Sequence, residues 1–337
     1  RKLIQGVPVL GTTDEIPKIV ERHNIDQILI AIPSLGGTGI SDIVRRCSET
    51  RADLTILPGL PQLINREVGT QMIRKISVED LMERTPVRVD MESIAGYTSE
   101  RRILVTGAGG SIGQEICRQL VSVNPAELIL LDINENDLYW IDRELKQHAD
   151  LKYRLVIADI KDRERIRDVF RECRPDVVFH AAAHKHVPLM ELNPGEAVKN
   201  NVLGTLNLAQ MAIEYDVHSF VMISTDKAVN PTSVMGTTKR VAEHIVQSFS
   251  QRIKDARQGK QVETCGFNGV APAKAVTRFT AVRFGNVLGS NGSVIPTMQK
   301  QIQQGGPVTV THEEMVRFFM TIPEAVQLVI QAGGLGA

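Results

Sequence analysis

The stretch STDKAVNPTSVMGTTKR, residues 224–240, places an acid beside a base and adds a second lysine downstream. Asp226 and Lys227 are adjacent, and Lys239 lies four residues after Met235. A carboxylic acid can donate a proton and a neutral amine can accept one, so the adjacent pair suits general acid–base catalysis. The thioether of Met235 has no exchangeable proton. The pattern therefore predicts a proton-transfer site in which Met235 packs against a ligand or shapes the pocket.

These side chains follow a predicted strand in a chain whose strands and helices alternate. The segment RRILVTGAGGSIGQEICRQLV predicts a strand, a tight glycine turn and an amphipathic helix. Alternation of this kind predicts an α/β, Rossmann-type doubly wound parallel sheet, which holds its ligands at the carboxyl ends of the strands. The other predicted strands of this series are residues 126–132, 151–160, 175–183, 218–225 and 279–289, with helices over 162–173, 201–215 and 237–251.

The glycine turn has the spacing of a dinucleotide-binding loop. Gly107, Gly110 and Gly113 permit close approach of the backbone to a pyrophosphate, and the helix that starts at Ser111 and Ile112 offers free N–H groups. Asp132 closes the next strand, nineteen residues after Gly113. A carboxylate there would accept hydrogen bonds from the adenosine ribose and repel a 2′-phosphate. The pattern therefore predicts NAD as the cofactor, in preference to NADP.

Two later strand ends are candidates for the same cofactor. Asp159, followed by Ile160, ends a strand where a side chain can reach an adenine edge, although a capping role for this aspartate explains the sequence nearly as well. Ala181 and Ala182 are small residues that permit close approach to a cofactor. The three histidines in HAAAHKHVP have no cysteine or carboxylate partner at ligand spacing, so no metal site is predicted.

The composition excludes several classes of function. Lys plus Arg and Asp plus Glu both number 39, so nothing indicates a nucleic-acid partner. The four cysteines are scattered and are expected to be reduced thiols. No apolar run approaches the ~20 residues that span a bilayer. Because the chain starts at Arg1 and stops soon after a predicted helix, both ends are expected to be truncated.

The chain is predicted to have two domains. Residues 1–97 alternate short strands (7–11, 27–33 and 54–59) with amphipathic segments, and predict a smaller, incomplete Rossmann-like α/β domain followed by a connector. That domain carries no ordered acid–base group and is expected to be non-catalytic. Residues 98–337 are then predicted to be the catalytic domain, which binds NAD and is expected to be truncated at its C-terminus.

Four segments together resemble the extended short-chain dehydrogenase/reductase superfamily: TGAGGSIG, HAAAHKHVP, STDKAVNPTSVMGTTKR and VRFGNVLGSNGSVIP. Within it they are similar to the large nucleotide-sugar 4,6-dehydratases of the capsular polysaccharide biosynthesis protein group. The resemblance implies a UDP-sugar substrate, UDP-N-acetylglucosamine above all, and a homo-oligomer. It also implies a cytoplasmic location, as the soluble part of an inner-membrane protein tethered by an upstream segment. Residues 251–280 are longer than the family pattern.

The resemblance also implies a reaction and a role for each residue. Such an enzyme oxidises the sugar at C4 with NAD, removes the C5 proton, expels the C6 hydroxyl as water and then reduces C6. Asp226 would be the acid at C6 and Lys227 the base at C5, while Lys239 would hold the nicotinamide ribose. Met235 stands where many superfamily members have a tyrosine. The group that deprotonates the C4 hydroxyl stays open between Thr225, Asp226 and a water. Substrate contacts are implied for Lys185, Asn286 and Arg317.

Two other functions remain open from the sequence. A nucleotide-sugar 4-epimerase shares the fold and the oxidation at C4, but it has no elimination for the Asp226–Lys227 pair to catalyse. A catalytically silent dinucleotide sensor would explain Met235 alone. The retention of Lys239 and Asn286 together with the pair argues against such a sensor.

Overall fold

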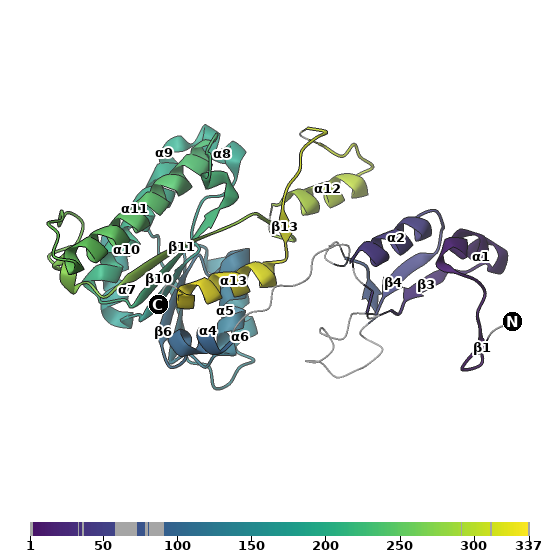
Figure 1. Ribbon diagram of the computed structural model, residues 1–337, viewed down its shortest axis with the longest axis horizontal. Coiled ribbons are helices and arrows are strands. Elements are labelled where there is room, and N and C mark those ends of the chain that lie inside the picture. Colours follow the sequence, from purple (N-terminus) through teal and green to yellow (C-terminus); the bar gives the residue numbers. More distant parts are fainter. Residues whose placement is uncertain are drawn as a thin grey trace. The chain divides into compact units, whose positions relative to one another are not determined.

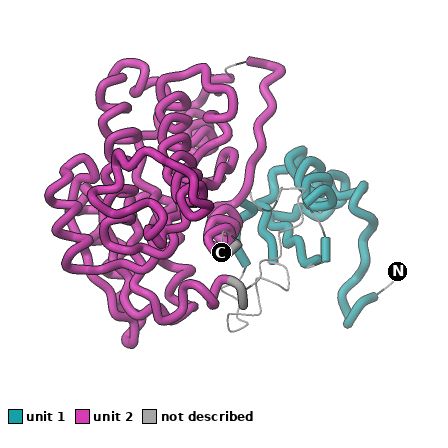
Figure 2. Tube along the Cα trace, turned by 60° about the vertical axis from the view of Figure 1, so that its left-hand side comes forward, with its two compact units in different colours: residues 1–86 teal, residues 87–337 magenta. Residues whose placement is uncertain are grey.

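The structure is a computed structural model, and it describes residues 3–32, 34–35, 37–57, 73–77, 80, 91–290, 292–310 and 312–335. The chain divides into two compact units, Arg1–Pro86 and Val87–Ala337 (Figure 2). Each unit has its own buried apolar core.

The first unit is a small α/β unit. Strands β3 (Gln27–Ile30) and β4 (Asp53–Ile56) are parallel, and β5 (Arg74–Lys75) pairs antiparallel to β4. Residues 7–11 were expected to form a strand of this sheet, but β2 (Val7–Pro8) pairs instead with β1 (Leu3–Ile4) in a hairpin. The cause is local, because Gln5 and Gly6 adopt positive φ angles of 49° and 82° and reverse the chain. The helical segments are η1 (Thr13–Glu15), α1 (Ile16–His23) and α2 (Gly37–Cys47).

The second unit is built on six parallel strands in the order β11-β10-β9-β6-β7-β8. The order reverses between β6 and β9, which is the switch point where doubly wound sheets bind ligands. The predicted doubly wound sheet is therefore confirmed. The strands are β6 (Arg102–Thr106), β7 (Glu127–Asp132), β8 (Tyr153–Ile157), β9 (Val177–His180), β10 (Ser219–Thr225) and β11 (Arg278–Phe284).

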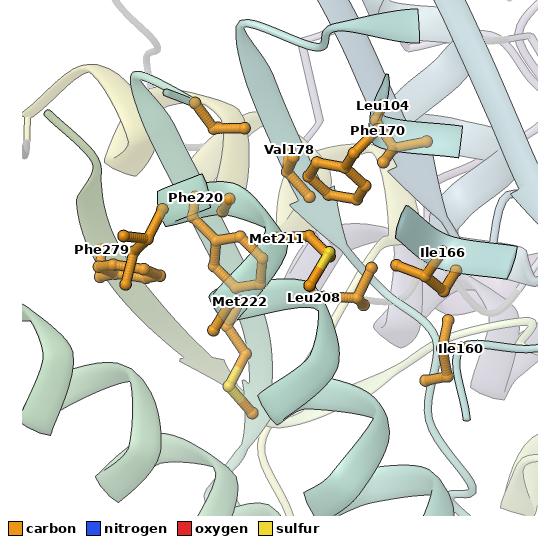
Figure 3. Close-up of a cluster of buried hydrophobic side chains, with 14 of the residues drawn as sticks. Leu104, Ile160, Ile166, Phe170, Val178, Leu208, Met211, Phe220, Met222 and Phe279 are labelled. Atoms are coloured by element: carbon orange, nitrogen blue, oxygen red, sulfur yellow. The ribbon is translucent and has the colours of Figure 1, made fainter. Parts of the chain in front are cut away.

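Helices cover both faces of this sheet (Figure 1). One face packs on α7 (Arg163–Cys173), α10 (Gly204–Glu214) and α11 (Val234–Arg257). Figure 3 shows this cluster, in which Leu104, Val178 and Phe220 project from neighbouring strands. The other face packs on α4 (Met91–Thr98), α5 (Ser111–Val121), α6 (Glu135–Leu145) and α13 (Ile322–Leu335).

The remaining elements of this unit are short or peripheral. They are α8 (Val187–Leu192), α9 (Pro194–Ala197), the π-helix η4 (Val198–Leu203), the 3₁₀ helices η5 (Asp226–Ala228) and η6 (Pro272–Lys274), α12 (Val294–Gln303), and the parallel pair β12 (Asn286–Val287) and β13 (Phe319–Met320).

The division between the units differs from the predicted boundary at 97/98. Helix α4 belongs to the second unit because its apolar residues pack against α13. Ile94 is buried there, and the Tyr97 hydroxyl donates a hydrogen bond to the carbonyl of Ile330. The irregular sequence around residues 64–97 concealed this helix.

The long segment 251–280 packs at the far end of α11. The helix continues to Arg257, and the chain then returns to place Phe267 against Phe249, with ring centroids 5.3 Å apart. The guanidinium of Arg252 lies 4.9 Å from one ring and 5.0 Å from the other. Phe249 is ten residues from Lys239, about 15 Å along a helix. The segment therefore completes the core around α10 and α11 at a distance from Lys239.

Candidate active site

The glycine turn at the end of β6 lies against the loop that follows β9. Gly107 has a φ of 69°, and a Cβ on it would lie 2.6 Å from the backbone nitrogen of Ala182. A Cβ on Gly113 would lie 2.0 Å from the carbonyl oxygen of Gly107. Glycine is therefore required at both positions. Helix α5 begins at Ser111, directly after Gly110, so its free N–H groups lie at the switch point.

Asp132, at the end of β7, is tied to the glycine turn. One carboxylate oxygen accepts the N–H of Gly109 at 2.9 Å, and the other accepts the N–H of Asn134 at 2.9 Å. Asp137 lies close by, and burial together with the charge of Asp132 raises its pKa. Two acidic groups beside this turn disfavour the binding of an additional phosphate group there, because like charges repel.

Asp159 and Ile160 follow β8. The Asp159 carboxylate accepts the backbone N–H of Lys161 at 2.9 Å and lies 3.5 Å from the ammonium of the same residue. The carboxylate therefore closes a local turn before α7, and the N-cap of that helix is Asp162 rather than Asp159. Ile160 is buried against Gly204, and its carbonyl accepts a hydrogen bond from Asn207. Its side chain therefore belongs to the core.

A buried polar network lies under the carboxyl ends of β6 and β9. The Thr205 hydroxyl donates to the carbonyl of Asn201 and lies 2.9 Å from Nε2 of His180, so this nitrogen is assigned as the donor to Thr205. Nδ1 of His180 then accepts from the hydroxyl of Thr106 at 2.8 Å. Burial and the nearby charge of Lys239 lower the pKa of His180 to about 3. His180 is therefore a neutral ring in the core, a role that the sequence did not reveal.

Lys239 lies on α11 with its side chain buried. Its ammonium donates to the carbonyl of Ile223 at 2.6 Å. Burial lowers the pKa of Lys239 to about 8, while the charge of Glu243 acts in the opposite direction. With a pKa of about 8, Lys239 is mostly protonated at neutral pH but titrates closer to that pH than an ordinary lysine does.

The predicted acid and base meet at the end of β10. The Lys227 ammonium lies 3.1 Å from a carboxylate oxygen of Asp226 and 3.2 Å from the amide oxygen of Asn286. The Thr225 hydroxyl donates to Asp226 at 2.8 Å. Burial raises the pKa of Asp226, but the hydrogen bonds from Thr225 and Lys227 outweigh it and the net shift is downward. In the free protein the pair is therefore a hydrogen-bonded ion pair.

The other predicted residues are placed differently. Met235 is buried with Met190 and Ala197, so its side chain forms part of the wall under α8 and α9. Lys185 and Arg317 are exposed, and Arg317 donates to the carbonyl of Val316 at 3.0 Å. Within the described ranges, neither of these two side chains bonds to the Asp226–Lys227 pair.

In the ranges that the structure describes, no group of three or more His, Cys, Asp or Glu side chains is arranged to hold a metal ion. No helix of the described residues is both long and apolar enough to cross a membrane.

A doubly wound parallel sheet, a glycine turn at its switch point and a buried lysine four residues after Met235 are features of the extended short-chain dehydrogenase/reductase class. A family model described as "Polysaccharide biosynthesis protein" matches residues 103–337, and one described as "CoA-binding domain" matches residues 1–58. The chain belongs to the polysaccharide biosynthesis protein family.

The chain is similar to several named proteins and spans about half the length of the first of them. It is 47% identical to the capsular polysaccharide biosynthesis protein CapD of Staphylococcus aureus, over 99% of this chain and 52% of that protein. It is 32% identical to the UDP-N-acetylglucosamine 4,6-dehydratase (inverting) of Campylobacter jejuni (68% and 62%). It is 33% identical to the UDP-glucose 4-epimerase of Rickettsia prowazekii (69% and 62%).

Among solved structures, the chain is similar to Pen from Bacillus thuringiensis. The TM-score is 0.61 and the sequence identity 32%, over 70% of this chain and 68% of that one. The likeness supports the same fold for the second unit.

Proposed function

We propose that this protein is an NAD-dependent nucleotide-sugar 4,6-dehydratase of polysaccharide biosynthesis. The observation that carries the proposal is the hydrogen-bonded Asp226–Lys227 pair at the end of β10. An elimination needs both a base for the C5 proton and an acid for the departing hydroxyl, because hydroxide is a poor leaving group. Oxidation at C4 alone needs neither a base at C5 nor an acid at C6.

The residues at the switch point fit a dinucleotide. The cradle formed by Gly107 and Gly113 has no room for a Cβ, and the first N–H groups of α5 lie beside it. Asp132 would hold the adenosine ribose, and Lys239 the nicotinamide ribose. Bound NAD would accept two electrons from C4 of the sugar and later return them to C6.

In the resting ion pair the shared proton is on Lys227. The elimination needs the opposite arrangement, with a neutral Lys227 and a protonated Asp226. A proton transferred from Lys227 to Asp226 across the 3.1 Å hydrogen bond creates the neutral amine and the neutral acid that the elimination needs. Lys227 then takes the C5 proton, and Asp226 protonates the leaving C6 hydroxyl. These two transfers regenerate the charged pair. C5 then takes a proton from solvent as the hydride reaches C6, and this proton balances the one that the C4 hydroxyl released during its oxidation. Asn286 orients the amine through its amide oxygen.

The substrate is proposed to be a UDP-sugar, with UDP-N-acetylglucosamine as the first compound to test. A location on the cytoplasmic side of a membrane, tethering through another segment and assembly into homo-oligomers stay predictions. Asn286 and Arg317 are the proposed contacts of the nucleotide diphosphate, since an arginine fork presents paired donors to phosphate oxygens. Lys185 is a further proposed substrate contact.

A 4-epimerase is the second candidate, and the relative of that name supports it. One incubation distinguishes the two. Protein supplied with NAD and UDP-N-acetylglucosamine should give a product lighter by one water, whereas an epimerase gives a product of unchanged mass. Absence of any conversion, with NAD bound, would favour a dinucleotide sensor.

A further inference from the structure

Glu243 is a carboxylate buried inside the catalytic unit. Its side chain is 1% exposed, and it accepts hydrogen bonds from two arginines and a serine. Arg283 donates through Nε at 2.7 Å and through Nη2 at 2.5 Å. Ser224 donates at 2.5 Å and Arg240 at 3.2 Å. Burial raises the pKa of Glu243, but the hydrogen bonds from Arg283 and Ser224 outweigh it, so the group is ionised.

The partners of Glu243 lie on the elements that carry the proposed site. Glu243 is four residues, or one helical turn, after Lys239 on α11. Ser224 directly precedes the Thr225–Asp226–Lys227 segment on β10. Arg283 lies on β11, three residues before Asn286, whose amide contacts Lys227. One carboxylate therefore joins the three chain segments on which the site depends.

Stability alone does not require such an arrangement. A buried ion pair gains little over well-packed apolar residues of similar volume, because both charges lose their hydration. The bidentate pairing with Arg283 does fix direction as well as distance, since the guanidinium fork is rigid. We infer that Glu243 is a positioning residue that fixes Lys239, the Asp226–Lys227 pair and Asn286 relative to one another. This inference deepens the proposed function and rests on it for the kinetic readout alone.

Glu243 also acts on Lys239 through its charge. The charged or titratable groups around Lys239 are Glu243 on the same helix and His180 on β9, with Arg240 and Arg283 on the outer side of Glu243. Since burial lowers the pKa of Lys239 and Glu243 opposes this, loss of the negative charge should lower that pKa further. Lys239 would then lose its proton at a lower pH.

The test compares Glu243→Gln and Glu243→Asp with Asp176→Asn. Asp176 accepts a hydrogen bond from the backbone N–H of Arg102 and pairs with its guanidinium at 3.8 Å, at the amino ends of the central strands β6 and β9, whereas the site lies at the carboxyl ends. It is therefore a matched carboxylate that holds structure without reaching the site. The titration of Lys239 is followed by NMR of the full chain labelled at lysine Cε, with the signal assigned by its loss in Lys239→Arg.

Lys239 should titrate near pH 8 in the wild type. In Glu243→Gln it should titrate about one pH unit lower. The pH above which kcat declines should shift downward together with the Lys239 titration. The value of kcat should also fall by roughly ten- to hundredfold, while KM changes far less. Glu243→Asp keeps the charge but shortens the reach, so kcat should fall while the titration stays in place. Asp176→Asn should alter neither. If Glu243→Gln does not fold, Glu243→Asp decides the matter through the kcat loss.

The inference would be overturned if Lys239 titrates at the wild-type pH in Glu243→Gln. It would also be overturned if Glu243→Asp keeps the wild-type kcat. The titration needs no substrate. A wild type that performs no dehydration would therefore contradict the proposed function, while the NMR result still decides whether Glu243 acts on Lys239.

Discussion

Acid should destabilise the catalytic unit through His180. The pKa of this ring is lowered from 6.5 to about 3 by burial and by Lys239, so the folded state resists its protonation. The sign follows from linkage, because between these two values the unfolded chain binds more protons than the folded one. The stability that depends on neutral His180 is fully present above pH 6.5 and is lost progressively as the pH falls toward 3.

The magnitude follows from the size of the pKa difference. One pKa unit corresponds to about 1.4 kcal/mol, so the whole range is worth about 5 kcal/mol, and about 3 kcal/mol should be lost between pH 7 and pH 4. This is a large share of the 5–15 kcal/mol by which typical domains are stable.

The assay is urea unfolding followed by circular dichroism at pH 7, 6, 5 and 4. His180→Gln, which keeps a donor and an acceptor toward Thr106 and Thr205, should be less stable at pH 7 but should lose about 3 kcal/mol less than wild type on going to pH 4. The control is His244→Gln, because His244 is exposed on α11, and it should follow wild type. Since carboxylates also titrate in this range, only the difference between variants is diagnostic. Parallel pH dependence of wild type and His180→Gln would refute the reasoning.

Three further outcomes are expected. Gly113→Ala should abolish NAD binding in titration calorimetry and destabilise the unit by about 2 kcal/mol or more, because its Cβ would lie 2.0 Å from a carbonyl oxygen. The control is Gly96→Ala, whose Cβ would meet no atom within 4 Å and which should have neither effect. Equal effects of the two variants would contradict the explanation by a steric clash. Binding titrations should show that the wild type binds NAD more tightly than NADP, and Asp132→Ser should reduce this difference in affinity. Tighter binding of NADP by the wild type would mean that Asp132 does not contact the ribose. Asp226→Asn and Lys227→Ala should each lower kcat by at least roughly 10²-fold, and Met235→Leu far less, because Met235 only packs; equal losses would give its sulfur a role that packing does not explain.

Local pattern predicted the parts of the site that local geometry determines. The glycine spacing predicted the turn because no Cβ fits at Gly107 or Gly113, and the strand–helix alternation predicted the sheet. The adjacency of Asp226 and Lys227 in the sequence does not by itself pair their side chains, because successive side chains of a strand point to opposite faces. They meet because the chain leaves β10 and enters the 3₁₀ helix η5 at Asp226.

What the sequence could not predict depends on contacts between distant residues. Glu243 is separated from Arg283 by 40 positions, and its place one turn after Lys239 was the available signal, but only packing shows that both side chains are buried together. His180 was considered only as a metal ligand, whereas its neutral state follows from its burial and from the charge of Lys239, which lies on another element. Helix α4 was taken for a connector because α13, which buries it, lies more than 200 residues later.

The most direct test of the account is turnover of UDP-N-acetylglucosamine by the NAD-loaded protein in deuterated water, with the product analysed by mass spectrometry and NMR. If Lys227 removes the C5 proton and Asp226 expels the C6 hydroxyl, the product is a 4-keto-6-deoxy sugar that has lost one water and carries solvent deuterium at C5. A product of unchanged mass, inverted at C4 and without deuterium on carbon, would contradict the account.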